Sequence, residues 1–369
     1  MAAIPHRNLT AEPAVAATEA IPLIRAANAY AEETLRPAAL RTDREGVAPE
    51  RIAELADRGL LNHVAPAEFG GGALDRSADR RVHEIIAGAC FNTWLVWAQH
   101  APLVWKLADV HHAGTPLPEL GYEILRGRTL VGAAVSDVRR FPRHHIAATR
   151  ASNGWTLSGT VSWFSGWGLS TALAVAAVED TTHTVVTALV PIDTNIRSAP
   201  LGLSAVAGSR TERVTLNDVF VPTANVIATQ SLSDWRTEDL GVASDARGHH
   251  FGLADTVLGE LERAGHSRAR DVAEIWRPRV AQIRSDAYAL ADEAKAAKDP
   301  HHRIDERLAA KVAIGEALAT LTRALLAARS GRGLALDDTA QLHARSALFV
   351  LVQGQSADVQ EAQLGHFAR

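Results

Sequence analysis

The spacing of apolar residues changes twice along this chain of 369 residues, and that change limits its fold more than any other feature. Apolar residues recur three and four apart up to about residue 125 and again from about 235 onward, as they do in helices. Between about 129 and 230 they alternate with polar residues or form short runs, as they do in strands. We therefore predict a mainly α protein with a central β domain, divided as 1–127, 128–232 and 233–369.

Proline and glycine residues indicate where some of the helices begin and end. Pro49 favours the start of a helix and Gly59 its end. Residues 90–110 are apolar enough to lie at the centre of a helical bundle, with tryptophans as their bulk. In the last third, residues 280–294 carry a helical stripe that follows Pro278, which we interpret as a helix start.

Charge and composition exclude several classes of function. Lys plus Arg number 38 and Asp plus Glu 42, so the formal charge is -4 and no strong field attracts nucleic acid or anionic lipid. No apolar run approaches the roughly 20 residues that span a bilayer, and the first residues lack the apolar core of a secretory signal. The lone Cys90 cannot form an internal disulfide. We expect a cytoplasmic protein with neither nucleic-acid nor membrane partners.

Four motifs stand out. One reads Trp-Phe-Ser-Gly at 163–166, at the end of a predicted strand. A second, 207–222, combines a Gly-Ser turn with a strand that ends in Val-Pro, and a third is the Gly-rich loop at 66–72. The fourth is the Gly-rich segment 328–334, followed by Arg345. Together, and over nearly the whole chain, these motifs resemble the acyl-CoA dehydrogenase superfamily, including its flavin-dependent monooxygenase branch.

The resemblance implies a fold and a cofactor. The fold would comprise an N-terminal helical domain, a middle β-barrel-like domain and a C-terminal four-helix bundle. The cofactor would be a noncovalent flavin, FAD or else FMN, and the chain would form a homodimer or homotetramer through the bundle. By motif, the cofactor-binding residues are Trp163, Phe164, Ser165, Ser209, Thr211, Gly331, Arg332 and Gly333. The alternative for the tryptophan is packing in the core, and for the hydroxyl residues a role in the turn itself.

The chain departs from the dehydrogenases at their catalytic base. The glutamate that removes a substrate proton in that family corresponds here to Gln353 or Gly354, and an amide is not a useful base. Some relatives carry the base elsewhere, and Asp245 lies in the corresponding region, with Glu238 and Asp239 before it. All three carboxylates have the alternative of being solvated loop residues. The departure favours an oxygen-using monooxygenase on a small organic substrate.

Three histidine predictions complete the candidate site. His100 resembles a residue that faces the flavin in the monooxygenase branch, where it would donate a hydrogen bond during oxygen chemistry. A core histidine is the alternative. We expect His249 and Gln353 to line the substrate pocket, and Arg247 to lie on the surface or to meet an anionic substrate. Neighbouring histidines point to different sides of a helix or strand, so we predict no metal site at His111-His112, His144-His145, His249-His250 or His301-His302.

Three functions remain open at this stage. A monooxygenase would need a separate flavin reductase, since the sequence has no evident pyridine-nucleotide fingerprint. An acyl-CoA dehydrogenase would need a relocated base such as Asp245 and an electron-accepting partner. A flavin-free relative with no catalytic activity is the third.

Overall fold

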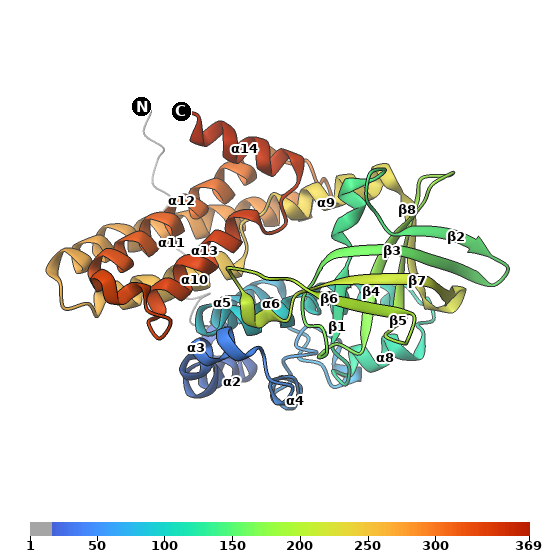
Figure 1. Ribbon diagram of the computed structural model, residues 1–369, viewed down its shortest axis with the longest axis horizontal. Helices are drawn as coiled ribbons and strands as arrows, with labels where there is room; N and C mark the ends of the chain where they lie inside the picture. The colour runs from blue at the N-terminus through green and yellow to red at the C-terminus, as the bar shows by residue number, and fades with distance from the viewer. Residues whose placement is uncertain (1–16) are drawn as a thin grey trace.

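The computed structural model describes residues 17–369 (Figure 1). Helices occupy the first part of the chain, as the spacing predicts. They are α2 (Pro22–Tyr30), α3 (Arg36–Glu45), α4 (Glu50–Asp57), α5 (Arg76–Ala89), α6 (Phe91–Ala98), α7 (Ala101–His112) and α8 (Glu119–Leu125). Helix α4 starts after Pro49 and ends before Gly59, as expected. The apolar run at 90–110 forms two helices, and its residues Trp94 and Trp97 are buried.

A single mixed sheet follows, in the order β6-β7-β3-β2-β4-β5-β8, with β1 pairing alongside β4. The strands are β1 (Val131–Ala134), β2 (Ala147–Ala151), β3 (Gly154–Phe164), β4 (Ala172–Glu179), β5 (Thr184–Pro191), β6 (Ile196–Pro200), β7 (Glu212–Pro222) and β8 (Val226–Ser231). Alternate residues of β3 and β7, such as Leu157 and Val219, enclose a hydrophobic core of the sheet's own. The sheet therefore folds around its own side chains, as a barrel-like domain does.

The last third is helical again. Its elements are α9 (Leu232–Ala243), α10 (Gly248–Glu262), α11 (Ser267–Ala297), α12 (Ile304–Arg329), α13 (Thr339–Val352) and α14 (Ala357–Phe367). Helices α10, α11, α12 and α13 pack together as a bundle. The prediction that Pro278 starts a helix is wrong, because α11 begins at Ser267 and contains that proline. The helix buries Ala269 and Ala273 before the proline, and these small residues give too weak a stripe to reveal its first turns.

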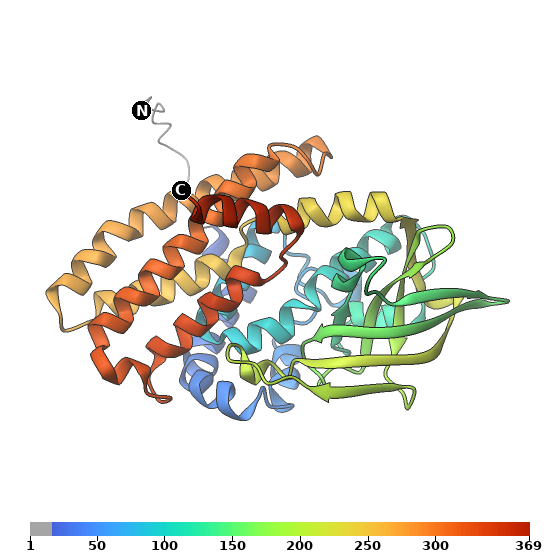
Figure 2. The same ribbon diagram turned by 45° about the horizontal axis from the view of Figure 1, so that its top comes forward.

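Helices α5 and α6 connect the bundle to the sheet (Figure 2). Helix α5 lies against α10 so closely that a Cβ atom on Gly252 would stand 2.1 Å from the backbone oxygen of Glu84. At the other side, a Cβ on Gly166 would stand 3.1 Å from Val96 of α6. Contacts from α6 thus fix the end of β3 relative to the bundle. Within residues 17–369, no helix combines the length and the apolarity needed to cross a bilayer.

Candidate functional site

Three predicted hydroxyl residues meet at the end of β3. The Ser165 and Thr211 oxygens lie 2.8 Å apart, and Thr211 lies 2.7 Å from the oxygen of Ser209. Ser209 in turn donates to the Val206 carbonyl at 2.7 Å. All three hydroxyl residues are buried. Because the chain of hydrogen bonds ends on a carbonyl, the hydroxyl protons are used within the protein while oxygen lone pairs remain to accept from a ligand.

The aromatic pair beside this cluster divides between surface and core. Trp163 is 45% exposed, so its ring presents an apolar surface outside the sheet. Phe164, the next residue on the strand, is fully buried, and its ring occupies the space that a side chain at Gly132 would need. The geometry therefore fits Trp163 to a cofactor-binding role and gives Phe164 a packing role, in place of the cofactor contact predicted for it.

Arg210, between two of these hydroxyl residues, has an unusual environment. Its Nε atom is buried and has no hydrogen-bond partner among the described residues. Its backbone adopts φ of +50°, a conformation that few residues other than glycine take up. A buried N–H without a partner costs about 1–3 kcal/mol, which an anionic ligand would recover. The sequence contains Arg210 within a motif, yet nothing in the motif assigns it a role.

The Gly-rich segment lies elsewhere. Residues Ser330–Leu334 form a short 3-10 helix between α12 and α13, at the end of the bundle away from the sheet (Figure 1). Gly331 and Arg332 are exposed, and Gly333 is buried. Arg332 extends to Asp338 at 3.3 Å. The structure does not bring this segment together with the hydroxyl cluster in one chain, so its contact with a flavin stays a prediction about a neighbouring subunit.

His100 is fully buried at the start of α7. Its Nδ1 accepts from the Val131 backbone N–H at 3.2 Å, and its Nε2 donates to the Leu61 carbonyl at 2.9 Å. Burial lowers the pKa of the ring to about 4, so the ring is neutral at pH 7. With both ring nitrogens bonded to backbone, the geometry gives His100 a structural role in place of the predicted catalytic one.

The C-terminal end of α9 is held by three cations. Arg307 donates to the carbonyl of Gly241, Arg247 to that of Val242 at 3.0 Å, and Lys311 to that of Ala243 at 2.6 Å. The last carbonyls of a helix carry partial negative charge, which cations stabilise. This cluster, which we call the α9 cap, joins residues of α9, α10 and α12.

The carboxylates of this region are paired within the protein. Asp245 accepts from Arg307 at 2.7 Å. Asp239 accepts two hydrogen bonds from Arg139, at 2.6 and 2.8 Å. Glu238 is exposed and accepts from Gln230. A carboxylate committed to a guanidinium is a poor candidate for removing a substrate proton, so the geometry does not support the catalytic role predicted for Asp245.

Lys311 lies deep in the protein, with 7% of its surface exposed. Burial, together with the charges of Arg247 and Arg139, lowers its pKa to about 7. Lys311 was not among the residues predicted from the sequence, although the sequence carries a signal for it. Lys311 falls on the buried stripe of α12, four residues after Arg307 and three before Ile314, where an apolar residue would be expected.

The predicted substrate residues lie on two elements. His249, in the first turn of α10, stacks on Trp94 with ring centres 4.2 Å apart, and its Nε2 is buried with no partner among the described residues. Burial, then His250 and Arg247, lowers its pKa well below the usual value. Gln353 follows α13 and is half-buried, and Gly354 next to it adopts φ of +63°.

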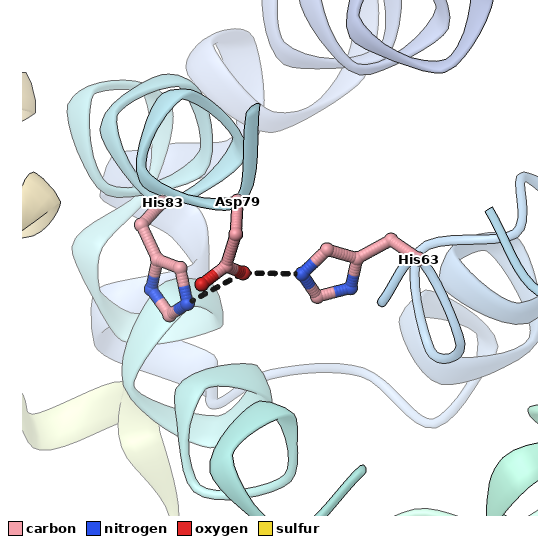
Figure 3. A group of neighbouring side chains, drawn as sticks. All are labelled: His63, Asp79 and His83. Atoms are coloured by element: carbon pink, nitrogen blue, oxygen red, sulfur yellow. Dashed lines mark hydrogen bonds and ion pairs between the residues drawn. The ribbon is translucent and has the colours of Figure 1, made fainter. Parts of the chain in front are cut away.

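His63, Asp79 and His83 form a cluster (Figure 3). It contacts Trp94 through His83. His63 Nε2 is 2.7 Å and His83 Nε2 is 3.6 Å from the same oxygen of Asp79. Although burial opposes it, the two rings lower the pKa of Asp79 to about 2. The sequence hint is modest, since only Asp79 and His83 share a helix, one turn apart.

The tautomer of His83 argues against a metal in this cluster. The indole N–H of Trp94 donates to His83 Nδ1 at 3.0 Å, so the proton of a neutral His83 ring is on Nε2, facing Asp79. A metal ligand needs a bare nitrogen at that position. Because Trp94 also carries His249 on its face, the geometry makes the cluster an anchor for that stack.

Comparison with known proteins places the chain. Residues 18–116 match the family described as acyl-CoA dehydrogenase, N-terminal domain. Over these residues the chain is similar to acyl-CoA dehydrogenases. A probable acyl-CoA dehydrogenase of Bacillus subtilis, YngJ, is 25% identical over 210 residues, which are 54% of this chain and 55% of YngJ. The match thus spans about half the length of that relative.

Solved structures of acyl-CoA dehydrogenase-like proteins share the fold of this chain. PigA in its FAD complex has a TM-score of 0.78 at 12% identity, with 99% of each chain covered. Dibenzothiophene monooxygenase TdsC of Paenibacillus sp. A11-2 has a TM-score of 0.75 at 16% identity, covering 94% of this chain and 96% of the other. At these identities the likeness concerns the fold alone.

The surroundings of Gly354 differ from what the resemblance to acyl-CoA dehydrogenases implies. A Cβ atom built on Gly354 would lie 4.0 Å from the Nζ of Lys311. Where the resemblance implies a carboxylate, this chain therefore has an unsubstituted backbone facing a buried amine.

Two surface cavities lie on the sheet domain. They have volumes of about 530 and 370 Å³. The larger is lined in part by Phe141, His145 and Arg236, the smaller in part by Trp155. None of the predicted site residues lines either cavity.

Proposed function

We propose that this protein is a flavin-dependent monooxygenase acting on a small organic substrate, within the flavin oxidoreductases of its superfamily. One observation carries the preference. The position of the dehydrogenase carboxylate holds Gln353 and Gly354, and the charged group facing that position is the amine of Lys311. Dehydrogenation of an acyl thioester needs a base at that point, whereas oxygen transfer does not.

The residues at the end of β3 fit a flavin. Exposed Trp163 offers a flat apolar wall, and the buried hydroxyls of Ser165, Ser209 and Thr211 offer acceptors beside it. The unpartnered Nε of Arg210 fits a phosphate of the same cofactor. A bound flavin, FAD or FMN, would supply the two-electron redox chemistry, and these side chains would bind and orient it.

The second candidate is acyl-CoA dehydrogenation with a relocated base, and the curated relative YngJ supports it. The ion pairs of Asp245 and Asp239 argue against either residue as that base. In this case Lys311, a titratable group beside Gly354, would be a candidate for the proton acceptor.

The proposed reaction has consequences for partners. Reduced flavin for oxygen chemistry would come from a separate flavin reductase, and a dehydrogenase would instead pass electrons to an acceptor protein. We propose a homodimer or homotetramer formed through the bundle, because α13 and α14 expose apolar side chains. These are Leu348, Val352, Leu364 and Phe367. The division at 127 and 232 and the cytoplasmic location remain predictions.

One experiment separates the candidates. The protein is reconstituted with FAD or FMN, freed of excess cofactor, and mixed anaerobically with butyryl-CoA and longer acyl-CoAs. We expect the visible flavin absorbance to persist. When the holoenzyme is then reduced with dithionite and exposed to oxygen, we expect the absorbance to return with a lag. Bleaching by an acyl-CoA would overturn the monooxygenase proposal, and failure to retain either flavin would overturn both candidates.

A further inference from the structure

A buried amine with spare hydrogen-bonding capacity faces the turn after α13. An ammonium has three donors, and the structure records one acceptor for Lys311, the Ala243 carbonyl at 2.6 Å. Burying a charge without partners is costly, so such a group either loses its proton or gains a partner of opposite charge. Contacts within the described residues therefore leave hydrogen-bond donors of the Lys311 amine free for a ligand.

The turn presents backbone, with no side chain at Gly354, to the amine. A Cβ atom built on Gly354 would stand 4.0 Å from the Lys311 amine. Gln353, Gly354 and Gln355 are all half-buried, which gives an approach from solvent. The space beside the amine is thus bounded by backbone, with no acidic side chain at these three positions to neutralise it.

The surrounding charges leave an excess of positive charge. Arg139 is neutralised by Asp239 and Arg307 by Asp245. Lys311 and Arg247 remain without a carboxylate partner in the structure and bond to carbonyls of the α9 cap. The charge of Lys311 acts on the rings of His249 and His250, whose pKa values are lowered chiefly by burial, that of His250 to about 3.

We propose that Lys311, supported by Arg247, forms a binding subsite for an oxyanion of the substrate, a carboxylate or a tetrahedral phosphate-like group, beside Gly354. The assignment of this subsite to a substrate rests on the proposed function, because it assumes that the subsite lies in the substrate pocket of a flavin enzyme. It defines the substrate as a molecule with an anionic end, held by the amine that faces Gly354.

The pH dependence of binding follows from the groups that face Lys311. Arg247 and Arg139 act on Lys311 through their charges. Both histidines stay neutral above pH 6 because burial lowers their pKa values. The two aspartates are held in ion pairs. With a pKa of about 7, Lys311 loses most of its charge between pH 6.5 and 8.5. Affinity for a small anion should fall about 20-fold over that range, in proportion to the protonated fraction.

Isothermal calorimetry on the purified protein tests the subsite, with acetate as the carboxylate probe and sulfate as the tetrahedral probe. Whichever probe binds more tightly identifies the form of the oxyanion. We expect Lys311→Arg to bind with the same affinity at both pH values, because arginine stays charged. Lys311→Met should lose binding at both, and the exposed Lys106→Met should behave as the wild type.

A second pair of variants leaves the α9 cap intact. At φ of +63°, Asp and Asn are the best-tolerated side chains after glycine. Gly354→Asp places a carboxylate against Lys311 and should abolish anion binding, whereas Gly354→Asn should retain most of it. Equal binding by this pair, binding by the wild type that does not change with pH, or no measurable binding of either probe would each overturn the subsite.

Failure of the subsite and failure of the proposed function give different results. Calorimetry needs no flavin, and flavin retention is read separately from visible absorbance. Lys311-dependent anion binding by a protein that retains no flavin would support the subsite and contradict the flavin chemistry. Bleaching by an acyl-CoA that depends on Lys311 would instead show that the amine is a base, and would overturn its role as an anion site.

Discussion

Acidification should destabilise this protein through a buried neutral histidine, and His100 is the clearest case. Its ring is fully buried and bonds two backbone groups, and burial lowers its pKa from 6.5 to about 4. The unfolded chain takes up a proton near pH 6.5, whereas the folded chain does so only near pH 4. Between those values the unfolded state binds more protons, so the free energy of unfolding falls as the pH decreases.

The magnitude follows from the two pKa values. For a shift from 6.5 to about 4, proton linkage lowers the free energy of unfolding by about 2 kcal/mol between pH 7 and pH 5. A stable domain has about 5–15 kcal/mol in total, so one such histidine is measurable. His100→Asn removes this titration and keeps an oxygen that can accept from Val131.

Urea unfolding of both proteins at pH 7 and pH 5 measures the difference. The variant will be less stable than the wild type at pH 7, because it loses the bond to Leu61 and some packing. Between pH 7 and pH 5 the wild type should lose about 2 kcal/mol more than His100→Asn does. Equal losses would refute the reasoning, since every other titrating group is shared by the two proteins.

Three further predictions concern the packing around the site. Gly252→Ala should lower the melting temperature strongly, because its Cβ would stand 2.1 Å from the backbone oxygen of Glu84. The control Gly315→Ala, whose Cβ meets nothing within 4 Å, should leave the melting temperature unchanged or raise it slightly. Arg284→Met should cost about 2 kcal/mol in urea unfolding, because the buried Glu84 carboxylate loses two charge-assisted hydrogen bonds from Arg284 and keeps only Arg81 at 3.3 Å and the Tyr288 hydroxyl at 2.7 Å. Ser209→Ala should cost about 1 kcal/mol and weaken flavin retention on gel filtration, and unchanged retention would remove Ser209 from the cofactor site.

Sequence periodicity predicted the large-scale fold because it reports burial along one element. Apolar steps of three and four marked the helices of both ends, and alternation marked strands such as β3. Ser165 and Thr211, which belong to two separate motifs 46 residues apart, lie 2.8 Å from each other, and their contact with a flavin stays a prediction. Periodicity failed at Pro278, where small buried alanines hide the first turns of α11.

The chemistry of the site was harder to predict because it depends on which elements pack together. His100 fitted a catalytic motif, yet its ring nitrogens bond to the backbone of two other segments. Asp245 is not available as a base because it pairs with Arg307, which lies 62 residues away in the sequence. Lys311 lies on the buried stripe of α12, and its position there does not by itself indicate a function. Its importance follows from the contact with Gly354, which the sequence does not show. Contacts of this kind leave no periodic trace in one sequence.

The most direct test of the proposed function is the anaerobic mixing of reconstituted holoenzyme with acyl-CoAs, followed by reduction and admission of oxygen. We predict that the visible flavin absorbance is unchanged by any acyl-CoA and that it returns with a lag after oxygen reaches the reduced protein. Bleaching by an acyl-CoA, with prompt reoxidation in oxygen, would contradict the account and make this chain a dehydrogenase.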